Sequence, residues 1–323
     1  MTIELRRGAV RAAIALALLA AAPVAAPAET TLTVGKANAT SDAIIPVNVG
    51  DQLGIFKKHG LDLKILDFGG GSKSAQAMAA GAIDIEDGAG TEMAFVAKGA
   101  PMLAVCESTA PAPFMAIGVP SDSSIHSIKD LKGKTIGVSS PGSFSDWLAH
   151  ELARKEGWGD DGVKTVGIGG ATTATIAAFK AHQIDAEIGG ASQFFAFEED
   201  KIGRLLASVS SYEGNVASGA LFASNKLIAS DPAAIRAFLV GWMETVDYMR
   251  AHKAETVKIE SGITHFNENV MSKEYDLVIG MFTKDCRFDA ESLATLKRSF
   301  VELKLLEEEP DMSKLYTEAY LPK

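Results

Sequence analysis

The sequence predicts an α/β protein built as two similar lobes joined by two crossovers. Three observations lead to this prediction. Strand-like and helix-like segments alternate along most of the chain, a series of motifs occurs twice at a nearly constant offset, and two stretches rich in proline, glycine and small residues bracket the second copy. The chain has 323 residues, of which 47% are hydrophobic, which is enough for sizeable cores.

Residues 1–28 have the pattern of a removable leader rather than of a folded segment. Three arginines precede an apolar run at 12–22, which is too short to span a bilayer comfortably, and Ala26-Pro27-Ala28 forms a small-x-small cleavage site. No cysteine lies near that site to be lipidated. We therefore expect a Sec signal peptide and a soluble, periplasmic product.

The charge of the chain argues against polyanionic partners. The formal net charge is −10 at pH 7, and loss of the arginine-rich leader makes it more negative. Nucleic acid and anionic membrane surfaces are therefore not expected as partners.

The two cysteines, Cys106 and Cys286, could pair in an exported protein. Their distance along the chain carries no information about their distance in space. We predict two free thiols, with Cys106 buried on a strand.

Before residue 110 the segments alternate between strand and helix. Apolar and β-branched runs predict strands at 32–36, 61–67 and 83–86, and another that ends near residue 108. Helical patterns predict a mostly helical segment at 46–59, a helix at 73–80 and another from residue 91 onward. Such alternation is typical of a parallel or mixed sheet covered by helices.

The same order of motifs returns about 100 residues later. The paired motifs, separated by 97 to 102 residues, are VG at 34–35 and IG at 136–137, GL at 60–61 and GW at 157–158, FGGG at 68–71 and IGGA at 168–171, and MAAGAID at 78–84 and FKAHQID at 179–185. One supersecondary plan has therefore been used twice, which predicts two similar lobes.

The stretch TIGVSSPGSFSDWLAH at 135–150 is a candidate ligand-binding turn. A short strand is stopped by Pro141 and Gly142, and Ser143 with Asp146 has the spacing of a capping box at the start of a helix. Free backbone N–H groups, the helix dipole and nearby serine hydroxyls favour an anion or another polar group there. Taken alone, such a turn can also be a capped strand-to-helix connection without a ligand.

Two further stretches divide the chain. APAP at 110–113, followed by an extended run, and the glycine-containing stretch 208–223 fit two crossovers that form a hinge, although either alone could be a surface loop. We expect the first lobe to hold 29–114 and 218–323, and the second lobe 115–217. From Asp231, which is expected to cap a helix that has Pro232 in its first turn, the pattern is helical, and these helices are expected to pack on the first lobe. The apolar residues of the first of these helices fall on one face: Ile235, Phe238, Leu239, Trp242 and Val246.

Four stretches, in this order and at these distances, resemble one known family: GLDLKILDFGGGSKSAQAMAAGAIDI (60–85), IKDLKGKTIGVSSPGS (128–143), IAAFKAHQIDAEI (176–188) and NKLIASDPAAIRAFL (225–239). Together with the leader, they are similar to the substrate-binding proteins of nitrate/taurine/alkanesulfonate-type ABC importers, a group that includes binders of thiamine precursors and aromatic compounds. The resemblance covers nearly all of the chain after residue 28, and DLKGKTIGV at 130–138 is its most recognisable part.

This resemblance implies a type II periplasmic-binding-protein fold that closes on a small molecule and delivers it to a membrane permease. It implies no cofactor, and we expect a monomer. The cleft would be lined by loops that follow the strands of both lobes. The implied ligand-binding residues are Lys36, Thr40, Ser41, Asp42, Gly70, Gly71, Ser72, Asp87 and Thr91 of the first lobe, and Ser139, Ser140, Ser143, Ser192, Gln193 and Tyr212 of the second.

The charge of the ligand depends on Lys36, which directly follows the first strand. If Lys36 points into the cleft, it and the helix after Ser143 favour a small organic anion. Asp42 and Asp87 act in the opposite direction, so that the ligand could carry an amino group as well as an acid. Alternatively, Lys36 is a solvated surface lysine.

One departure from the family concerns residues 187–192. Many relatives carry a Trp-Glu-Pro-like stretch after the second Asp-Ala, whereas this chain has EIGGAS there. Small residues in place of an aromatic wall and a carboxylate imply a wider pocket and a different ligand.

Enzyme signatures are weak in this sequence. FGGGSKS at 68–74 lacks the glycine that a P-loop places before its lysine, the six histidines are scattered without HExxH or a Cys/His cluster, and no GxSxG occurs. We therefore assign no catalytic residue and no metal ligand. A ligand-sensing adaptor for a signalling receptor and a cofactor-synthesis enzyme on the same fold stay open as alternatives.

Overall fold

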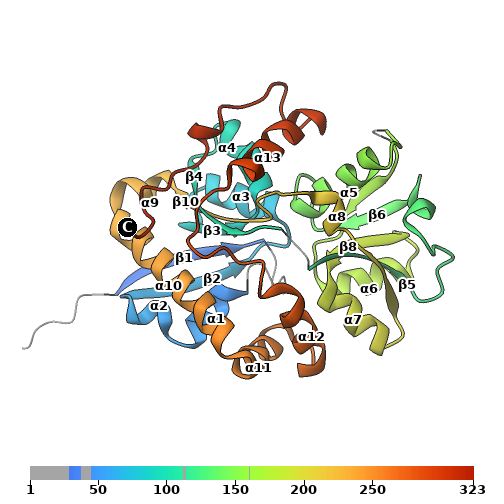
Figure 1. Ribbon diagram of the computed structural model, residues 1–323, viewed down its shortest axis with the longest axis horizontal. Coiled ribbons are helices and arrows are strands. Elements are labelled where there is room, and N and C mark those ends of the chain that lie inside the picture. The colour runs from blue at the N-terminus through green and yellow to red at the C-terminus, as the bar shows by residue number, and fades with distance from the viewer. Residues whose placement is uncertain (1–28, 38–44, 112–113, 160) are drawn as a thin grey trace, which may run out of the picture.

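The computed structural model describes residues 29–37, 45–111, 114–159 and 161–323. The chain forms two lobes, each with a five-stranded sheet covered by helices (Figure 1). The predicted signal peptide and three of the predicted ligand-binding residues, Thr40, Ser41 and Asp42, lie outside the described residues. Within those ranges, no helix combines the length and the apolar character that crossing a membrane requires.

The first sheet has the strand order β2-β1-β3-β10-β4. Its strands are β1 (Thr30–Lys36), β2 (Leu61–Asp67), β3 (Ile85–Gly88), β4 (Met102–Thr109) and β10 (Gly219–Ser224). β1 runs parallel to β2 and β3, and β10 runs antiparallel to β3 and β4. The fourth position of this sheet is therefore filled by a strand that enters from the other half of the chain.

The second sheet repeats this plan with the order β7-β6-β8-β5-β9. Its strands are β5 (Met115–Pro120), β6 (Thr135–Val138), β7 (Lys164–Gly167), β8 (Ala186–Gly190) and β9 (Gly203–Ser208). β6 is parallel to β7 and β8, and β5 is antiparallel to β8 and β9. The chain passes from the first sheet to the second between β4 and β5, and it returns to the first sheet between β9 and β10. The two-lobed α/β architecture with two crossovers is therefore confirmed.

The helices lie mainly on the faces of these sheets. They are α1 (Pro46–Gln52), α2 (Ile55–Lys58), α3 (Gly71–Ala79), α4 (Met93–Ala97), α5 (Phe144–Lys155), α6 (Thr172–Lys180), α7 (Ala191–Glu199), α8 (Ser210–Glu213), α9 (Asn225–Ser230), α10 (Pro232–Ala251), α11 (Lys253–Thr264), α12 (Glu268–Val278) and α13 (Ala290–Glu302), with 3-10 turns η2 (Gly90–Glu92), η3 (Ile128–Leu131) and η4 (Met312–Lys314).

The motif repeat corresponds to repeated hydrogen bonds. Asp84, at the end of the first MAAGAID motif, accepts a hydrogen bond from the backbone N–H of Thr33 at 3.0 Å. Asp185, at the end of the second motif, accepts one from Thr135 at 2.9 Å. Asp84 therefore ties the segment before β3 to β1, and Asp185 ties the segment before β8 to β6, so the role of each aspartate is structural.

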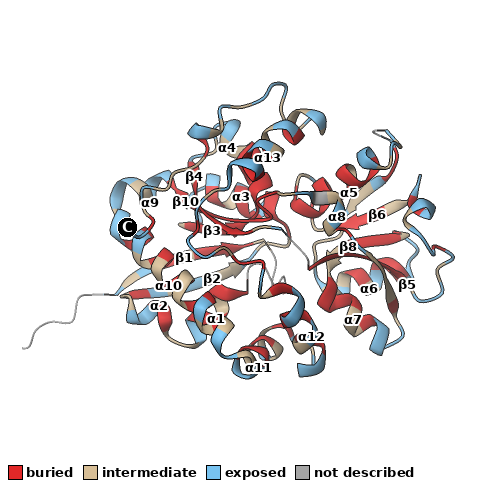
Figure 2. Ribbon diagram, viewed as in Figure 1, coloured by how far each residue is buried: buried red, intermediate tan, exposed pale blue. Residues whose placement is uncertain are grey.

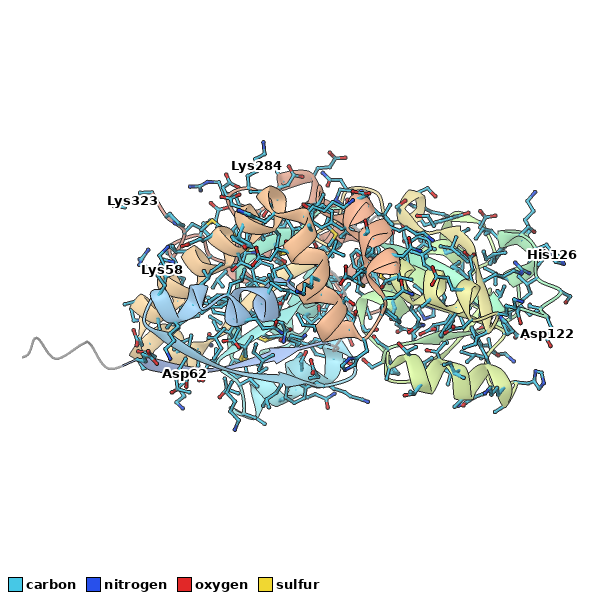
Figure 3. All side chains as sticks on the ribbon, turned by 90° about the horizontal axis from the view of Figure 1, so that it is seen from below. Lys58, Asp62, Asp122, His126, Lys284 and Lys323 are labelled. Atoms are coloured by element: carbon cyan, nitrogen blue, oxygen red, sulfur yellow. A yellow bond between two sulfur atoms is a disulfide. The ribbon has the colours of Figure 1, made fainter. Side chains whose placement is uncertain are left out.

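Buried residues concentrate on the sheets and on the helix faces that cover them (Figure 2). In α10, the predicted apolar face is buried, and the Phe238 ring stacks on Phe56 of α2 with centroids 5.1 Å apart. Asp231 caps α10 as expected, because its carboxylate accepts the N–H of Ala234 at 3.0 Å. Lys58 and Asp62 lie at one end of the molecule and Asp122 and His126 at the other, so the lobes follow one another along the long axis (Figure 3).

The prediction of two free cysteines is wrong. Cys106 in β4 and Cys286 form a disulfide, with their Cα atoms 4.5 Å apart. The segment after α12 returns alongside β4, where Glu107 donates its backbone N–H to the carbonyl of Cys286 at 3.0 Å. This proximity arises from tertiary packing across 180 residues, which no sequence spacing reveals.

One expectation about the helices is confirmed and one needs correction. The segment 46–59 is mostly helical, and Gly54, in a left-handed conformation (φ +69°), divides it into α1 and α2. The C-terminal helices do not pack on the first lobe alone, since α12 begins against α7 of the second lobe. There, Asn267 and Asn269 donate side-chain hydrogen bonds to Glu199 at 2.8 and 2.9 Å.

Candidate functional site

A pocket of about 100 Å³ lies between the lobes, at the carboxyl ends of the parallel strands of both sheets. This edge is where open α/β sheets bind ligands. The lining residues from the first sheet's side are Ala37, Gly71, Gly88, Ala89, Glu92 and Ser218. Those from the second sheet's side are Phe114, Met115, Ser139, Ser143, Phe144, Ser145, Gly170, Glu187, Ile188, Gly189, Gly190, Ser192 and Gln193.

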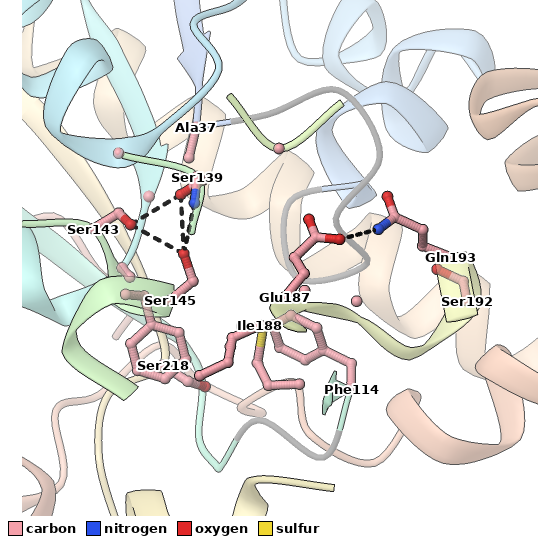
Figure 4. A pocket seen from close by; sticks show the side chains of 18 of the residues that line it. Ala37, Phe114, Ser139, Ser143, Ser145, Glu187, Ile188, Ser192, Gln193 and Ser218 are labelled. Atoms are coloured by element: carbon pink, nitrogen blue, oxygen red, sulfur yellow. Dashed lines mark hydrogen bonds between the residues drawn. The ribbon is translucent and has the colours of Figure 1, made fainter. Parts of the chain in front are cut away.

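One wall of the pocket is a cluster of serine hydroxyls at the start of α5 (Figure 4). Ser139 donates to Ser143 at 2.9 Å, and the hydroxyl of Ser145 lies 3.2 and 3.1 Å from those of Ser139 and Ser143. The predicted capping box does not form: Ser143 makes no side-chain cap, and Asp146 accepts the N–H of Gly142 instead. The Ser143 hydroxyl is engaged within the serine cluster and faces the pocket.

A carboxylate of the second lobe, Glu187, lines the pocket across from the serines (Figure 4). It accepts hydrogen bonds from Thr175 at 3.0 Å and from the Gln193 amide at 2.7 Å. Burial raises its pKa to about 7, although both hydrogen bonds act in the opposite direction. The two hydrogen bonds therefore only partly offset the effect of burial on the charged form of Glu187.

A second carboxylate, Glu92, comes from the first lobe. It is fully buried at the start of α4, and one of its oxygens accepts hydrogen bonds from the Ala89 N–H and the Thr91 hydroxyl. The other oxygen, Oε1, has no hydrogen-bond partner among the described residues. Burial raises the pKa of Glu92 to about 7.

Behind Glu92 lie two more buried acids of β3, Glu86 and Asp87. Burial raises the pKa of Glu86 well above its usual value, and repulsion from Glu92 adds to the shift. Burial also raises the pKa of Asp87, which the nearby Lys36 partly offsets. The first lobe therefore places an excess of acidic groups beside the pocket.

The lobes touch at the rim of the pocket. The hydroxyls of Ser72 and Ser140 lie 2.7 Å apart across the lobes. At Gly70 (φ +140°), an added Cβ would lie 2.2 Å from the Ser140 hydroxyl oxygen. Gly70 therefore permits close approach of the second lobe.

The structure brings five of the predicted site residues together as lining of the pocket: Gly71, Ser139, Ser143, Ser192 and Gln193. Gly70, Ser72 and Ser140 meet at its rim. Asp87 and Thr91 are buried and do not line it.

Two predicted site residues lie elsewhere. Lys36 is 1% exposed, donates to Asn48 and lies 3.5 Å from Asp67, so it is neither a pocket-lining cation nor a solvated surface lysine. Tyr212 donates its hydroxyl to Glu156 at the end of α5, 2.7 Å away, and does not line the pocket.

Sequence reasoning missed Glu92 and Glu187. For Glu187, the available signal was the repeat, because Glu86 and Glu187 follow the two ID motifs at the same position. The stretch EIGGAS does line the pocket with small residues, as expected, but its first residue supplies a carboxylate, and Phe114 and Phe144 supply aromatic wall.

Comparisons with known proteins agree with this architecture. Residues 42–256 match the family model described as NMT1/THI5 like. A relative from Brucella abortus, named only as a candidate binding protein, is 26% identical over 217 residues, which cover 65% of this chain and 65% of the relative. The match thus spans slightly less than two thirds of the relative's length.

Two solved structures share the fold. The alkanesulfonate-binding protein SsuA from Xanthomonas axonopodis pv. citri, bound to MOPS, has a TM-score of 0.76 at 19% identity, covering 90% of this chain and 99% of that one. The desulfurization enzyme DszB has a TM-score of 0.64 at 13% identity, covering 90% and 97%. The two-lobed periplasmic-binding-protein fold is confirmed, and the family match spans most of the described residues. The chain belongs to the NMT1/THI5-like family.

Proposed function

We propose that the chain is a solute-binding protein that encloses a small organic molecule between its lobes and delivers it to the permease of an ABC importer. The observation that carries this proposal is the pocket itself, which is built from strand-end loops of both lobes and meets cross-lobe contacts at its rim. Hinged, two-lobed proteins bury ligands in such a cleft. The names of the Brucella and Xanthomonas proteins support a binding role.

The proposal includes export to the periplasm through a cleaved leader at 1–28 and action as a monomer. It also places a polar or acidic end of the ligand at the serine cluster of Ser139, Ser143 and Ser145, beside the first N–H groups of α5. The expectation of a purely anionic ligand depended mainly on Lys36 in the cleft, and Lys36 does not line the pocket.

Two other functions compete. DszB shows that an enzyme can use this fold, and a sensor adaptor would use the same cleft. Incubation with a bound compound, followed by mass spectrometry, separates binding from catalysis, since a binding protein returns its ligand unchanged.

A thermal-shift screen of residues 29–323 tests the proposal. The compounds should include sulfonates, carboxylates, amino acids, amines, amidines and neutral pyrimidines. A ligand that binds only the folded state raises the melting temperature. Uptake of a hit by cells with and without the protein then tests delivery, and unchanged uptake would contradict the importer role.

A further inference from the structure

The pocket carboxylates belong to a pair of equivalent sites in the two lobes. In the first lobe, Ser74 of α3 donates to Glu86 of β3; in the second, Thr175 of α6 donates to Glu187 of β8. Both pairs are 12 residues apart in the chain. The motif repeat therefore extends beyond the aspartates to a hydroxyl–carboxylate pair in each lobe.

The two lobes differ at the position six residues after each of these glutamates. Gln193, six residues after Glu187, donates its amide to that carboxylate at 2.7 Å. Six residues after Glu86 the chain has Glu92, which has no N–H to donate. A carboxylate thus stands in the first lobe where the second lobe has an amide donor.

This exchange leaves acceptors without donors. Glu86 Oε2 and Glu92 Oε1 are both buried and have no hydrogen-bond partner among the described residues. A buried acceptor without a partner is costly, and a buried carboxylate without a counter-charge is more so. Glu92 lines the pocket, so a ligand there can supply the missing donor.

Gly71 lies beside the unpaired oxygen of Glu92, Oε1. An added Cβ on Gly71 would lie 1.7 Å from Glu92 Oε1, and Gly71 itself lines the pocket. A side chain at this position would therefore displace the carboxylate from its present place.

The part of the pocket lining that the structure describes carries acidic side chains without basic ones. Among the described residues, the lining contains two glutamates and no Lys, Arg or His. Within the described ranges, no group of three or more His, Cys, Asp or Glu is arranged to hold a metal ion.

We infer that the solute is a small organic molecule with a protonated nitrogen, an ammonium or amidinium group, which binds between Glu92 of the first lobe and Glu187 of the second. The N–H groups of the ligand donate to the unpaired oxygen of Glu92 on the first-lobe side of the cleft and to Glu187 on the second-lobe side. This inference rests on the proposed function and specifies the class of solute.

The test uses residues 29–323 and two matched sets of probes at pH 8. The first set contains nitrogen cations, such as β-alanine, taurine, ethylamine and acetamidine. The second contains propionate, ethanesulfonate, ethanol and acetamide. Thermal shift identifies binders, and calorimetry measures their affinity for the wild type and for Glu92→Gln, Glu187→Gln and Gly71→Ala.

Glu107→Gln is the matched control. Glu107 is also buried, its pKa is also raised to about 7 by burial, and its carboxylate accepts from Ser292, but it does not line the pocket. We expect binders in the first set, with affinity lowered about tenfold or more by each pocket variant and unchanged by Glu107→Gln. Folding of the glutamine variants is checked by their melting temperatures without ligand.

The possible outcomes separate the inference from the proposed function. Binding of compounds from the second set only, or affinity for a nitrogen cation that survives both glutamine substitutions, would overturn the inference and leave solute binding intact. Stabilisation by no compound of either set or of the broader screen would count against both.

Discussion

The hydroxyl oxygens of Ser72 and Ser140 lie 2.7 Å apart although the two serines belong to different lobes. This contact closes the rim of a pocket whose lining comes from both lobes. Ligand binding and lobe closure are therefore expected to depend on one another.

Substitution of Gly70 by alanine should impair closure. Its Cβ would lie 2.2 Å from the Ser140 oxygen, so we expect weaker ligand binding and a smaller decrease in the radius of gyration on ligand addition. Gly81→Ala is the control, because Gly81 also has a positive φ but no atom within 4 Å of the added Cβ. Small-angle scattering checks both variants and the monomeric state. Equal compaction of Gly70→Ala and wild type would argue against closure at this rim.

Ser143→Ala should weaken binding only modestly, by about 1 kcal/mol if one neutral hydrogen bond to the ligand is lost. The loss is small because Ser139 and Ser145 stay in place beside the backbone N–H groups of α5. Calorimetry with a ligand from the screen measures the change. An affinity equal to that of the wild type would remove the Ser143 hydroxyl from the binding site.

The disulfide should contribute to stability but not to ligand binding. The double variant Cys106→Ser, Cys286→Ser removes a cross-link between residues 180 apart, and we expect a loss of about 2 to 5 kcal/mol in the free energy of unfolding. Neither cysteine lines the pocket, so the ligand affinity should stay within about twofold, a change of roughly 0.4 kcal/mol. Chemical denaturation and calorimetry provide these values. Alkylation of both thiols in the native, unreduced protein would contradict the pairing.

The protein without ligand should lose stability as the pH rises from about 4.5 to about 7. Burial raises the pKa of Glu92, Glu107 and Glu187 from 4.5 to about 7. Between these values the folded state binds more protons than the unfolded chain, so its stability falls with rising pH, by at most about 3 kcal/mol per group. Scanning calorimetry should show this fall, and it should be shallower in Glu92→Gln, which keeps Glu86 and Asp87 beside it. A melting temperature that rises over this range would contradict the assignment.

Much of the fold could be predicted from local patterns. The strand at 61–67 has the bounds of β2, and the Asp231 cap and the buried face of α10 follow from capping chemistry and helical periodicity. The repeat of motifs predicted two lobes because each copy forms the same three parallel strands, and Asp84 and Asp185 make the same hydrogen bond in each.

The features that sequence reasoning missed depend on tertiary contacts. The Cys106–Cys286 pair and the contact of Asn267 with Glu199 join segments that no local pattern relates. Lys36 lies at the end of a strand, as predicted, but its ammonium group contacts Asn48 and Asp67 and does not line the pocket. Glu92 is distinguished by its Oε1 atom, which has no hydrogen-bond donor among the described residues, and only the three-dimensional structure shows this.

A crystal structure of residues 29–323 with a ligand from the screen tests the central claim most directly. The account predicts density for the ligand between the lobes, in contact with the serine cluster, with Glu92 of the first lobe and with Glu187 of the second. Ligand density outside this pocket, or contacts confined to one lobe, would contradict it.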